Sequence, residues 1–173
     1  MPQNVLSYSG QSAMIKNSNE LKNLFKRIGY RCWQFKQVLF PVIDQNLWHE
    51  AILALPSDWR PHLKKLRPSE RAHVLRVYKA VKEDNSLTEK EKERLLILAL
   101  VHDIGKGITR HSLWFKIAKV IFPVSNAAHC IEGALLLRRL GADRKLIRLV
   151  LRHHSTMQND ELLKKFQGFD DRL

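Results

Sequence analysis

Apolar residues recur at intervals of three and four along most of this chain, and no stretch alternates apolar with polar residues. Leu21, Leu24, Phe25 and Ile28 show the pattern near the start. Such spacing gathers apolar side chains on one face of an α-helix, whereas a half-buried strand needs alternation. The sequence therefore predicts an all-α fold, in which amphipathic helices pack into a compact bundle.

Pattern and composition divide the chain into three parts. Residues 1–19 are polar and aperiodic, which is typical of a terminal tail. Residues 20–68 form a predicted N-terminal helical extension, with helices near 20–39 and 46–55 followed by a proline-punctuated stretch. Residues 69–173 hold the remaining predicted helices, and we expect them to form one structural unit with this extension.

Capping and breaking residues set the expected bounds of the later helices. Ser69 is interpreted as the N-cap of the first, and Thr88 with Glu91 forms a capping box that opens the next. Gly141 is expected to end a helix as its C′ residue, and Asp143 to cap the helix that follows. The predicted helices cover about 70–82, 89–101, 112–122, 125 or 126 to 140, 144–154 and 161–167.

The chain carries 30 lysines and arginines against 17 aspartates and glutamates, so its net charge is +13. This excess favours anionic partners such as phosphorylated metabolites, nucleic acid or lipid headgroups. The basic residues are spread along the chain and form no dedicated nucleic-acid arm. A length of 173 residues suits one domain that buries its core without a disulfide scaffold.

Further features exclude several classes of protein. The two cysteines, Cys32 and Cys130, stand in unrelated contexts, so we expect neither a disulfide framework nor a cysteine zinc site. The N-terminus lacks the charged start and apolar stretch of a signal peptide. The longest apolar run, from Leu95 to Val101, is far shorter than the roughly 20 residues that span a bilayer. We therefore expect a cytoplasmic protein that is soluble or at most peripheral.

Histidines and aspartates recur on the apolar faces or at the ends of the predicted helices. An imidazole or carboxylate in such a place must find a partner or suffer a large desolvation penalty. Several such groups from different helices can satisfy one another around a cation. A single histidine on an apolar face is more often a core residue, but an ordered set favours a metal site. The set comprises His73, His102, Asp103, His129, His153, His154, Asp170 and Asp171.

The ligand types narrow the choice of metal. Mixed histidine and carboxylate ligands suit Mn²⁺, Fe²⁺, Zn²⁺ or Ni²⁺ better than Mg²⁺ or Ca²⁺, so we expect one or two divalent transition-metal ions. The adjacent His102 and Asp103 at a helix end can point into one cavity, and the two oxygens of Asp103 allow it to bridge two metals. A bridged metal pair lowers the pKa of bound water and makes a nucleophile near neutral pH.

Four sequence elements stand in a suggestive order. Residues 73–77 read HVLRV, residues 98–107 read LALVHDIGKG, residues 129–134 read HCIEGA, and His153 and His154 are adjacent. In this order they resemble the H-x-x-R-V, HDIGK, H-P-x-x-G-A and HH elements of the HD superfamily of metal-dependent phosphohydrolases. The Gly-Tyr-Pro element of HD-GYP cyclic-di-GMP phosphodiesterases does not follow the HH pair, which counts against that substrate.

The resemblance covers about residues 69–173 and implies a helical HD-domain bundle with a mononuclear or binuclear metal site. The metal ligands that it implies are His73, His102, Asp103 and Asp170 (favoured over Asp171) for one ion, and His129, His153 and His154 for a second ion, with Asp103 between them. It also implies that Asp103 and Lys106 act in catalysis and that Lys106 faces the substrate phosphate. The further candidates for substrate binding are Arg76, Arg110 and His111.

Other residues keep simpler interpretations. His49 and His62 are interpreted as structural. The basic amphipathic segment 111–123, which reads HSLWFKIAKVIFP, fits a helix packed over the core and site, and it also fits peripheral contact with an anionic membrane.

The sequence as a whole predicts an enzyme that hydrolyses a nucleotide or other small phosphorylated metabolite through a metal-activated water. Both a phosphomonoesterase and a phosphodiesterase fit this prediction. One alternative is a nucleotide-sensing HD module without turnover. The other is a protein that binds anionic membrane or nucleic acid through its charge.

Overall fold

The computed structural model describes residues 29, 36, 39–108, 128–155 and 159–173 of the chain. Within them lie seven α-helices, one short 3-10 helix and no strand, so the predicted all-α class is confirmed. The predicted helices near 20–39 and 112–122 lie largely or wholly outside the described residues, as does the predicted tail. None of the helices in the described ranges is long and apolar enough to cross a bilayer.

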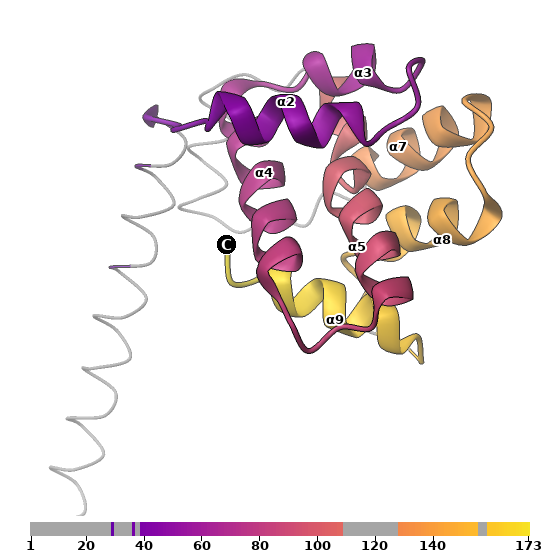
Figure 1. Cartoon of the computed structure of the whole chain (residues 1–173). Coiled ribbons are helices and arrows are strands. Elements are labelled where there is room, and N and C mark those ends of the chain that lie inside the picture. The colour runs from indigo at the N-terminus through magenta and orange to yellow at the C-terminus, as the bar shows by residue number, and fades with distance from the viewer. Residues whose placement is uncertain (1–28, 30–35, 37–38, 109–127, 156–158) are drawn as a thin grey trace, which may run out of the picture.

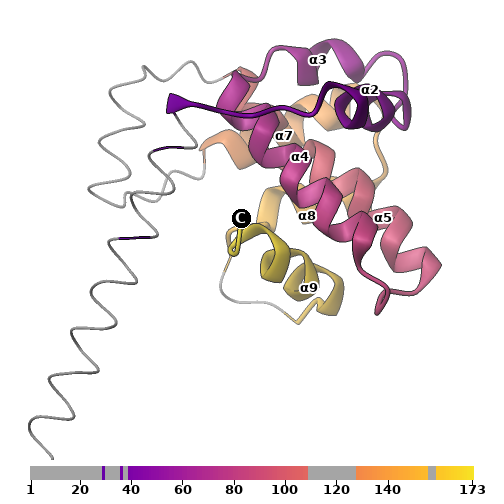
Figure 2. The ribbon, with the colours of Figure 1, turned by 60° about the vertical axis from the view of Figure 1, so that its left-hand side comes forward.

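The helices pack as a small bundle around two central members. The elements are α2 Gln45–Leu53, α3 Arg60–Lys64, α4 Pro68–Glu83, α5 Glu89–Val101, η1 Ile104–Gly107, α7 Ala128–Arg139, α8 Arg144–Arg152 and α9 Glu161–Asp170. Helices α4 and α5 lie side by side, α2 and α3 cover one end of the pair, and α9 crosses the other end (Figure 1). Helices α7 and α8 pair with each other, and the turned view in Figure 2 keeps α9 opposite α2 and α3.

Three of the predicted helix signals are confirmed. Thr88 and Glu91 form the capping box, since the Glu91 carboxylate accepts the Thr88 backbone N–H at 3.0 Å and the Thr88 hydroxyl accepts the Glu91 N–H at 3.4 Å. The Asp143 carboxylate accepts two backbone N–H groups at the start of α8. Gly141 has a φ of 73°, a left-handed conformation that suits the C′ position after α7.

Helix α4 begins slightly earlier in the sequence than predicted, so the prediction of its N-cap is wrong. Ser69 lies inside the helix, which begins at Pro68 with Arg67 as its N-cap. Proline fits the first helical position because its φ is already helical and it has no N–H to satisfy. The Glu70 carboxylate accepts the Arg67 backbone N–H at 2.8 Å, which closes the first turn.

Other bounds differ where tertiary packing decides them. The proline-rich stretch contains the short helix α3, with Pro61 in its first turn. Helix α8 ends at Arg152 instead of near His154. Helix α9 continues to Asp170, beyond the predicted end at residue 167.

One hydrophobic cluster connects the described helices. It runs from Trp48 on α2 to Phe166 on α9 and includes the end of α5. All residues from Leu98 to Val101 are fully buried, so the polar residues that follow them enter the interior of the protein. The Trp59 indole N–H donates to the carbonyl of Leu140 after α7 at 3.3 Å, which ties the α3 region to the α7–α8 turn.

Helix α9 packs against the residues that follow α5 and α8. The Phe166 side chain is fully buried, and its ring meets the His102 ring edge-on with centroids 5.2 Å apart. The Gln167 amide donates to the carbonyls of His153 and Ser155, each at 2.9 Å, and so holds the residues that follow α8. Helix α9 therefore helps to position His102 at the end of α5 and His153 at the end of α8.

We expect Phe166→Ala to lower the free energy of unfolding by about 3–5 kcal/mol, because it leaves a cavity between α9 and α5. Urea unfolding followed by circular dichroism measures this loss. Phe40→Ala is the matched control, since Phe40 is 70% exposed and its truncation should change stability by less than about 0.5 kcal/mol. Equal effects of the two changes would contradict the assignment of Phe166 to the core.

Candidate metal centre

The buried end of α5 delivers the first two candidate ligands. His102 is the C-cap of α5, Asp103 precedes η1, and both side chains are about 1% exposed. The Nδ1 atom of His102 lies 3.0 Å from the Ala99 carbonyl oxygen. A carbonyl oxygen only accepts, so Nδ1 carries a proton, and Nε2 is the ring nitrogen that faces the carboxylates of Asp103 and Asp170.

Helices α4 and α9 bring two more candidate ligands to this point. His73 on α4 forms a group with His102 and Asp103 in which one donor atom from each residue lies within 4.8 Å of the others. At the end of α9, Asp170 Oδ1 lies 2.8 Å from His73 Nε2 and 3.5 Å from His102 Nε2. Asp171, the alternative late aspartate, is the exposed C-cap of α9.

Helices α7 and α8 supply a second group of donors. His129, Cys130, His153 and His154 each place one donor atom within 4.8 Å of the others. Asp103 Oδ1 lies 3.4 Å from His129 Nε2 and 3.8 Å from His153 Nε2, whereas Asp103 Oδ2 faces His102 Nε2 at 3.4 Å. The carboxylate of Asp103 thus stands between the two groups, with one oxygen toward each.

The donor atoms fit a divalent cation. His102 Nε2, Asp103 Oδ1 and His153 Nε2 are buried and lack a hydrogen-bond partner within the described part of the chain. Buried polar atoms in proteins are nearly always hydrogen-bonded, so three such atoms converging on one region need a shared partner. Neutral imidazoles and ionised carboxylates are a ligand set that a transition metal satisfies.

The protonation states depend on the contacts within the centre. Burial opposes protonation of His102, but Asp103 and then Asp170 raise its pKa, so a bound cation would take the place of the Nε2 proton. Burial, reinforced by the neighbouring His102, lowers the pKa of His153 to about 3, so this imidazole is neutral at pH 7. Although burial opposes ionisation, Lys106 and then His102 hold the pKa of Asp103 well below its usual range. Burial likewise opposes ionisation of Asp170, but His102 and His73 lower its pKa.

Lys106 forms an ion pair with Asp103, and its Nζ lies 2.5 Å from Asp103 Oδ2. Its side chain is 33% exposed, whereas that of Asp103 is 1% exposed. Lys106 therefore reaches from the rim of the centre to its buried floor. Arg76 is half-buried on α4 and directs its guanidinium toward the C-terminus, where it donates to the Leu173 carbonyl at 3.4 Å.

Two glycines allow η1 and α7 to approach closely beside the centre. A Cβ added at Gly105 would lie only 2.0 Å from the backbone oxygen of His129 and 2.6 Å from the backbone nitrogen of Gly133. A Cβ added at Gly133 would stand 3.3 Å from the Gly105 nitrogen. The glycine in the HDIGK motif is thus required to bring His129 next to Asp103, and Gly133 lies on the other side of the same contact.

The structure brings the sequence-predicted metal ligands into one region. Two candidates for substrate binding, Arg110 and His111, lie outside the described residues, as does the segment 111–123 on which the expected membrane contact depends. His49 is exposed on α2 and His62 lies on α3, and neither belongs to the two donor groups.

Sequence reasoning missed Cys130. The sequence predicts no cysteine zinc site and does not name Cys130 as a donor; in the structure Cys130 is buried and its Sγ belongs to the second donor group. The signal was its position directly after His129. Adjacent residues at the end of α5 already supply two donors to one region, and the His129–Cys130 pair repeats that arrangement at the start of α7.

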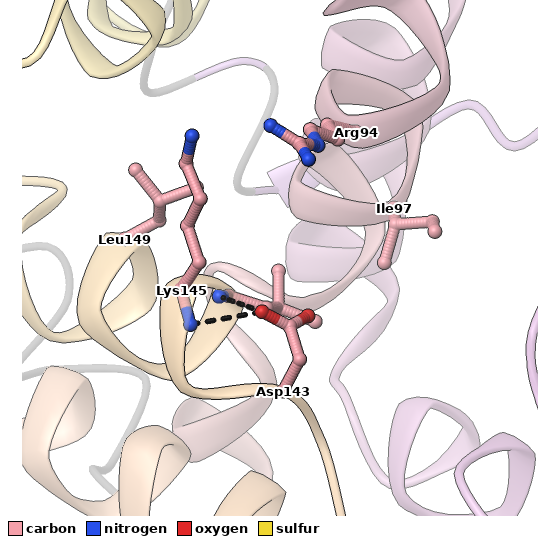
Figure 3. A pocket seen from close by; sticks show the side chains of 6 residues that line it. Arg94, Ile97, Asp143, Lys145 and Leu149 are labelled. Carbon is pink, nitrogen blue, oxygen red and sulfur yellow. Dashed lines mark hydrogen bonds between the residues drawn. The ribbon is translucent and has the colours of Figure 1, made fainter. Parts of the chain in front are cut away.

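A hollow of about 150 Å³ between α5 and α8 contains none of these donors. Figure 3 shows Arg94 and Lys145 at this hollow, with the Asp143 carboxylate directed at the backbone of α8. That carboxylate already accepts the N–H groups of Lys145 and Leu146 at 2.8 and 3.1 Å. The hollow is thus a shallow feature between two helices, distinct from the candidate metal centre.

The HD domain family model matches residues 71–169, which is more than half of the chain. The chain belongs to the HD domain family. This confirms the resemblance on which the sequence-based assignment rested, and the matched range contains the donor residues except Asp170. HD domains belong to a superfamily of metal-dependent phosphohydrolases and bind divalent metals. Comparison with curated proteins and with solved structures gave no match.

We expect Gly105→Ala to destabilise the HD domain by at least about 2 kcal/mol, because the new methyl group meets backbone atoms that cannot move aside cheaply. Metal retention should fall with it as His129 is displaced. Urea unfolding and elemental mass spectrometry measure the two effects. Gly29→Ala is the control, since no atom lies within 4 Å of its added Cβ, and it should leave both unchanged or raise stability slightly.

A matched pair of substitutions distinguishes the two late aspartates. We expect Asp170→Asn to weaken binding at the His73–His102 side, because Asp170 Oδ1 lies 2.8 Å from His73 Nε2 and 3.5 Å from His102 Nε2. Asp171→Asn should leave metal content unchanged. Elemental mass spectrometry of both purified variants reports the number of ions per chain, and a loss in Asp171→Asn alone would reverse the assignment.

Proposed function

We propose that this HD domain protein hydrolyses a phosphate ester of a nucleotide or of another small phosphorylated metabolite. The carrying observation is the convergence of three buried donor atoms that have no hydrogen-bond partner among the described residues, on His102, Asp103 and His153. A fold that keeps such atoms desolvated and unpaired loses stability unless a ligand satisfies them. A cluster of side chains whose only role is to pack the core would not require buried polar atoms without hydrogen bonds.

A divalent transition metal bound here supplies a water nucleophile near neutral pH and polarises the phosphoryl oxygens of the substrate. The chain's own residues fix where this happens. His102 and His153 each donate Nδ1–H to a backbone carbonyl, at 3.0 and 2.7 Å, so both rings are held with Nε2 toward the centre. Asp103 orients both donor groups around its two oxygens.

Lys106 is the residue that we assign to the phosphate. Asp103 raises the pKa of Lys106 above its usual value even though burial opposes this, so the ammonium stays charged. Its side chain is partly exposed beside a buried anionic floor, a position from which an ammonium can bind a phosphoryl oxygen. A positive charge there stabilises the negative charge that develops on the transferred group.

Access to the centre is asymmetric, which supports a small substrate. His102 and His153 are buried, whereas the side chains of His73 and Lys106 are 23% and 33% exposed and His154 is exposed. Buried donors thus lie next to partly exposed ones, which supports the binding of a small phosphate group beside the exposed members. The overall charge of +13 favours an anionic substrate.

The decisive experiment measures phosphate release from nucleotides, phosphate monoesters and phosphate diesters by protein loaded with Mn²⁺, Fe²⁺, Zn²⁺ or Ni²⁺. We expect one substrate class to be turned over, and we expect His102→Ala to abolish that activity because it removes a floor ligand. His49→Ala is the matched control, since it changes an exposed histidine on α2, and it should keep full activity.

The other outcomes separate the alternative functions. Nucleotide binding without turnover, lost in His102→Ala, would assign the protein as a sensing HD module. Turnover that persists in His102→Ala would place the reaction elsewhere in the protein.

A further inference from the structure

Cys130 is a buried thiol beside the candidate ligands of α7 and α8. It is 2% exposed, follows His129 directly in α7, and its Sγ lies 3.6 Å from His129 Nε2. The donor atoms of His129, Cys130, His153 and His154 all lie within 4.8 Å of one another. Three nitrogens and one sulfur therefore lie within one small region.

His153 independently indicates that a ligand belongs at this point. Its side chain is fully buried, and its Nδ1 is committed to the Val150 carbonyl at 2.7 Å. Its Nε2 is buried and has no hydrogen-bond partner among the described residues. Since Nδ1 is already hydrogen-bonded, Nε2 is the nitrogen that His153 can offer to the donor group containing Cys130, and a metal ion or a hydrogen-bond donor would satisfy its lone pair.

The spacing between the sulfur and the nearest nitrogen matches metal coordination. Tetrahedral zinc has Zn–N bonds of about 2.0–2.1 Å and Zn–S bonds of about 2.3 Å, which separates N from S by about 3.5 Å. The observed separation between Cys130 Sγ and His129 Nε2 is 3.6 Å. These two side chains can bind the same ion with little movement.

We propose that Cys130 Sγ is a ligand of the metal held by His129, His153 and His154, and that this position prefers Zn²⁺ to Mn²⁺. This inference rests on the proposed metal-dependent function. The thiol releases its proton to solvent as the metal–sulfur bond forms. A thiolate is a soft ligand and favours Zn²⁺, whereas carboxylate-rich sites suit Mn²⁺.

The two halves of the centre are therefore chemically unlike. The half at α4, α5 and α9 combines His73 and His102 with the carboxylates of Asp103 and Asp170. The half at α7 and α8 combines three imidazoles with a thiolate, and it shares Asp103 at its edge. Protein equilibrated with both metals should hold Zn²⁺ in the second half and exchange Mn²⁺ in the first.

Cobalt substitution tests the ligand directly. Full-length protein carrying Cys32→Ala, in which Cys130 is the sole cysteine, is stripped of metal and titrated with Co²⁺. We expect an intense near-ultraviolet absorption from sulfur-to-cobalt charge transfer, together with the weaker visible bands of a bound ion. The same protein carrying Cys130→Ser should keep visible bands from the first position but lose the charge-transfer band.

Zinc retention gives a second readout. Dialysis against equal Zn²⁺ and Mn²⁺, followed by elemental mass spectrometry, should show preferential Zn²⁺ in the Cys32→Ala protein. Outer-sphere partners of metal ligands are each worth about 10–100-fold in affinity, so losing a direct ligand in Cys130→Ser should weaken zinc binding by at least about tenfold. Unfolding by urea in the metal-free state checks that the substitution leaves the fold intact.

Each outcome separates this inference from the proposed function. Visible cobalt bands without charge transfer in the Cys32→Ala protein would overturn the cysteine ligand and leave the metal centre standing. That spectrum requires no change at Cys130, so it decides the question even when Cys130→Ser fails to fold. Equal zinc affinity of the two folded proteins would likewise overturn the inference. Failure to bind any metal would overturn the inference and the proposed function together.

Discussion

The burial of Asp103 is the constraint on which the rest of the structure depends. A carboxylate that is 1% exposed and ionised must be surrounded by compensating groups, because an unpaired charge in the interior is prohibitively costly. Lys106 contributes one such group from the next turn of chain. The others are imidazoles from α5, α7 and α8 that surround the carboxylate within 4 Å. The bundle is arranged so that the ends of these helices meet at one carboxylate.

The convergence of these helix ends on Asp103 requires close approach of the backbones as well as complementary charges. Gly105 and Gly133 remove the side chains that would keep η1 and α7 apart, and His129 then lies beside Asp103. Helix α9 closes the opposite side, where Phe166 packs on the His102 ring and Gln167 holds the residues after α8. The two glycines thus position His129, and Phe166 and Gln167 position His102 and His153, so that all three imidazoles lie around Asp103.

The sequence predicted the parts of this arrangement that depend on local chemistry. The all-α class, the Thr88 capping box, the Asp143 cap and the Gly141 C′ position follow from periodicity and cap residues, which act within a few residues. The end of α9 was missed because its last turn is fixed by contacts with α4 and α5, far away in sequence. The donor set could be predicted because histidines and aspartates on apolar faces must be satisfied.

What the sequence could not provide was the spacing between helices. No local pattern states that Asp170 lies 2.8 Å from His73, almost a hundred residues earlier. Nor does one state that the thiol after His129 turns inward, since a lone cysteine in a helix is more often a small apolar residue of the core. Cys130 is identified only when its Sγ is seen together with three imidazole donors.

Charge links the buried floor to the kind of substrate that the centre can take. The two carboxylates, Asp103 and Asp170, are buried beside the ammonium of Lys106 and the imidazoles of the donor groups, inside a strongly basic protein. Divalent cations held by these carboxylates and imidazoles would add positive charge to the centre. An anion would then be required to balance that charge, and His73 and Lys106 are partly exposed side chains beside which it could bind. A phosphate group meets that requirement better than a neutral substrate does, which is why the same geometry that argues for metal also argues for phosphate.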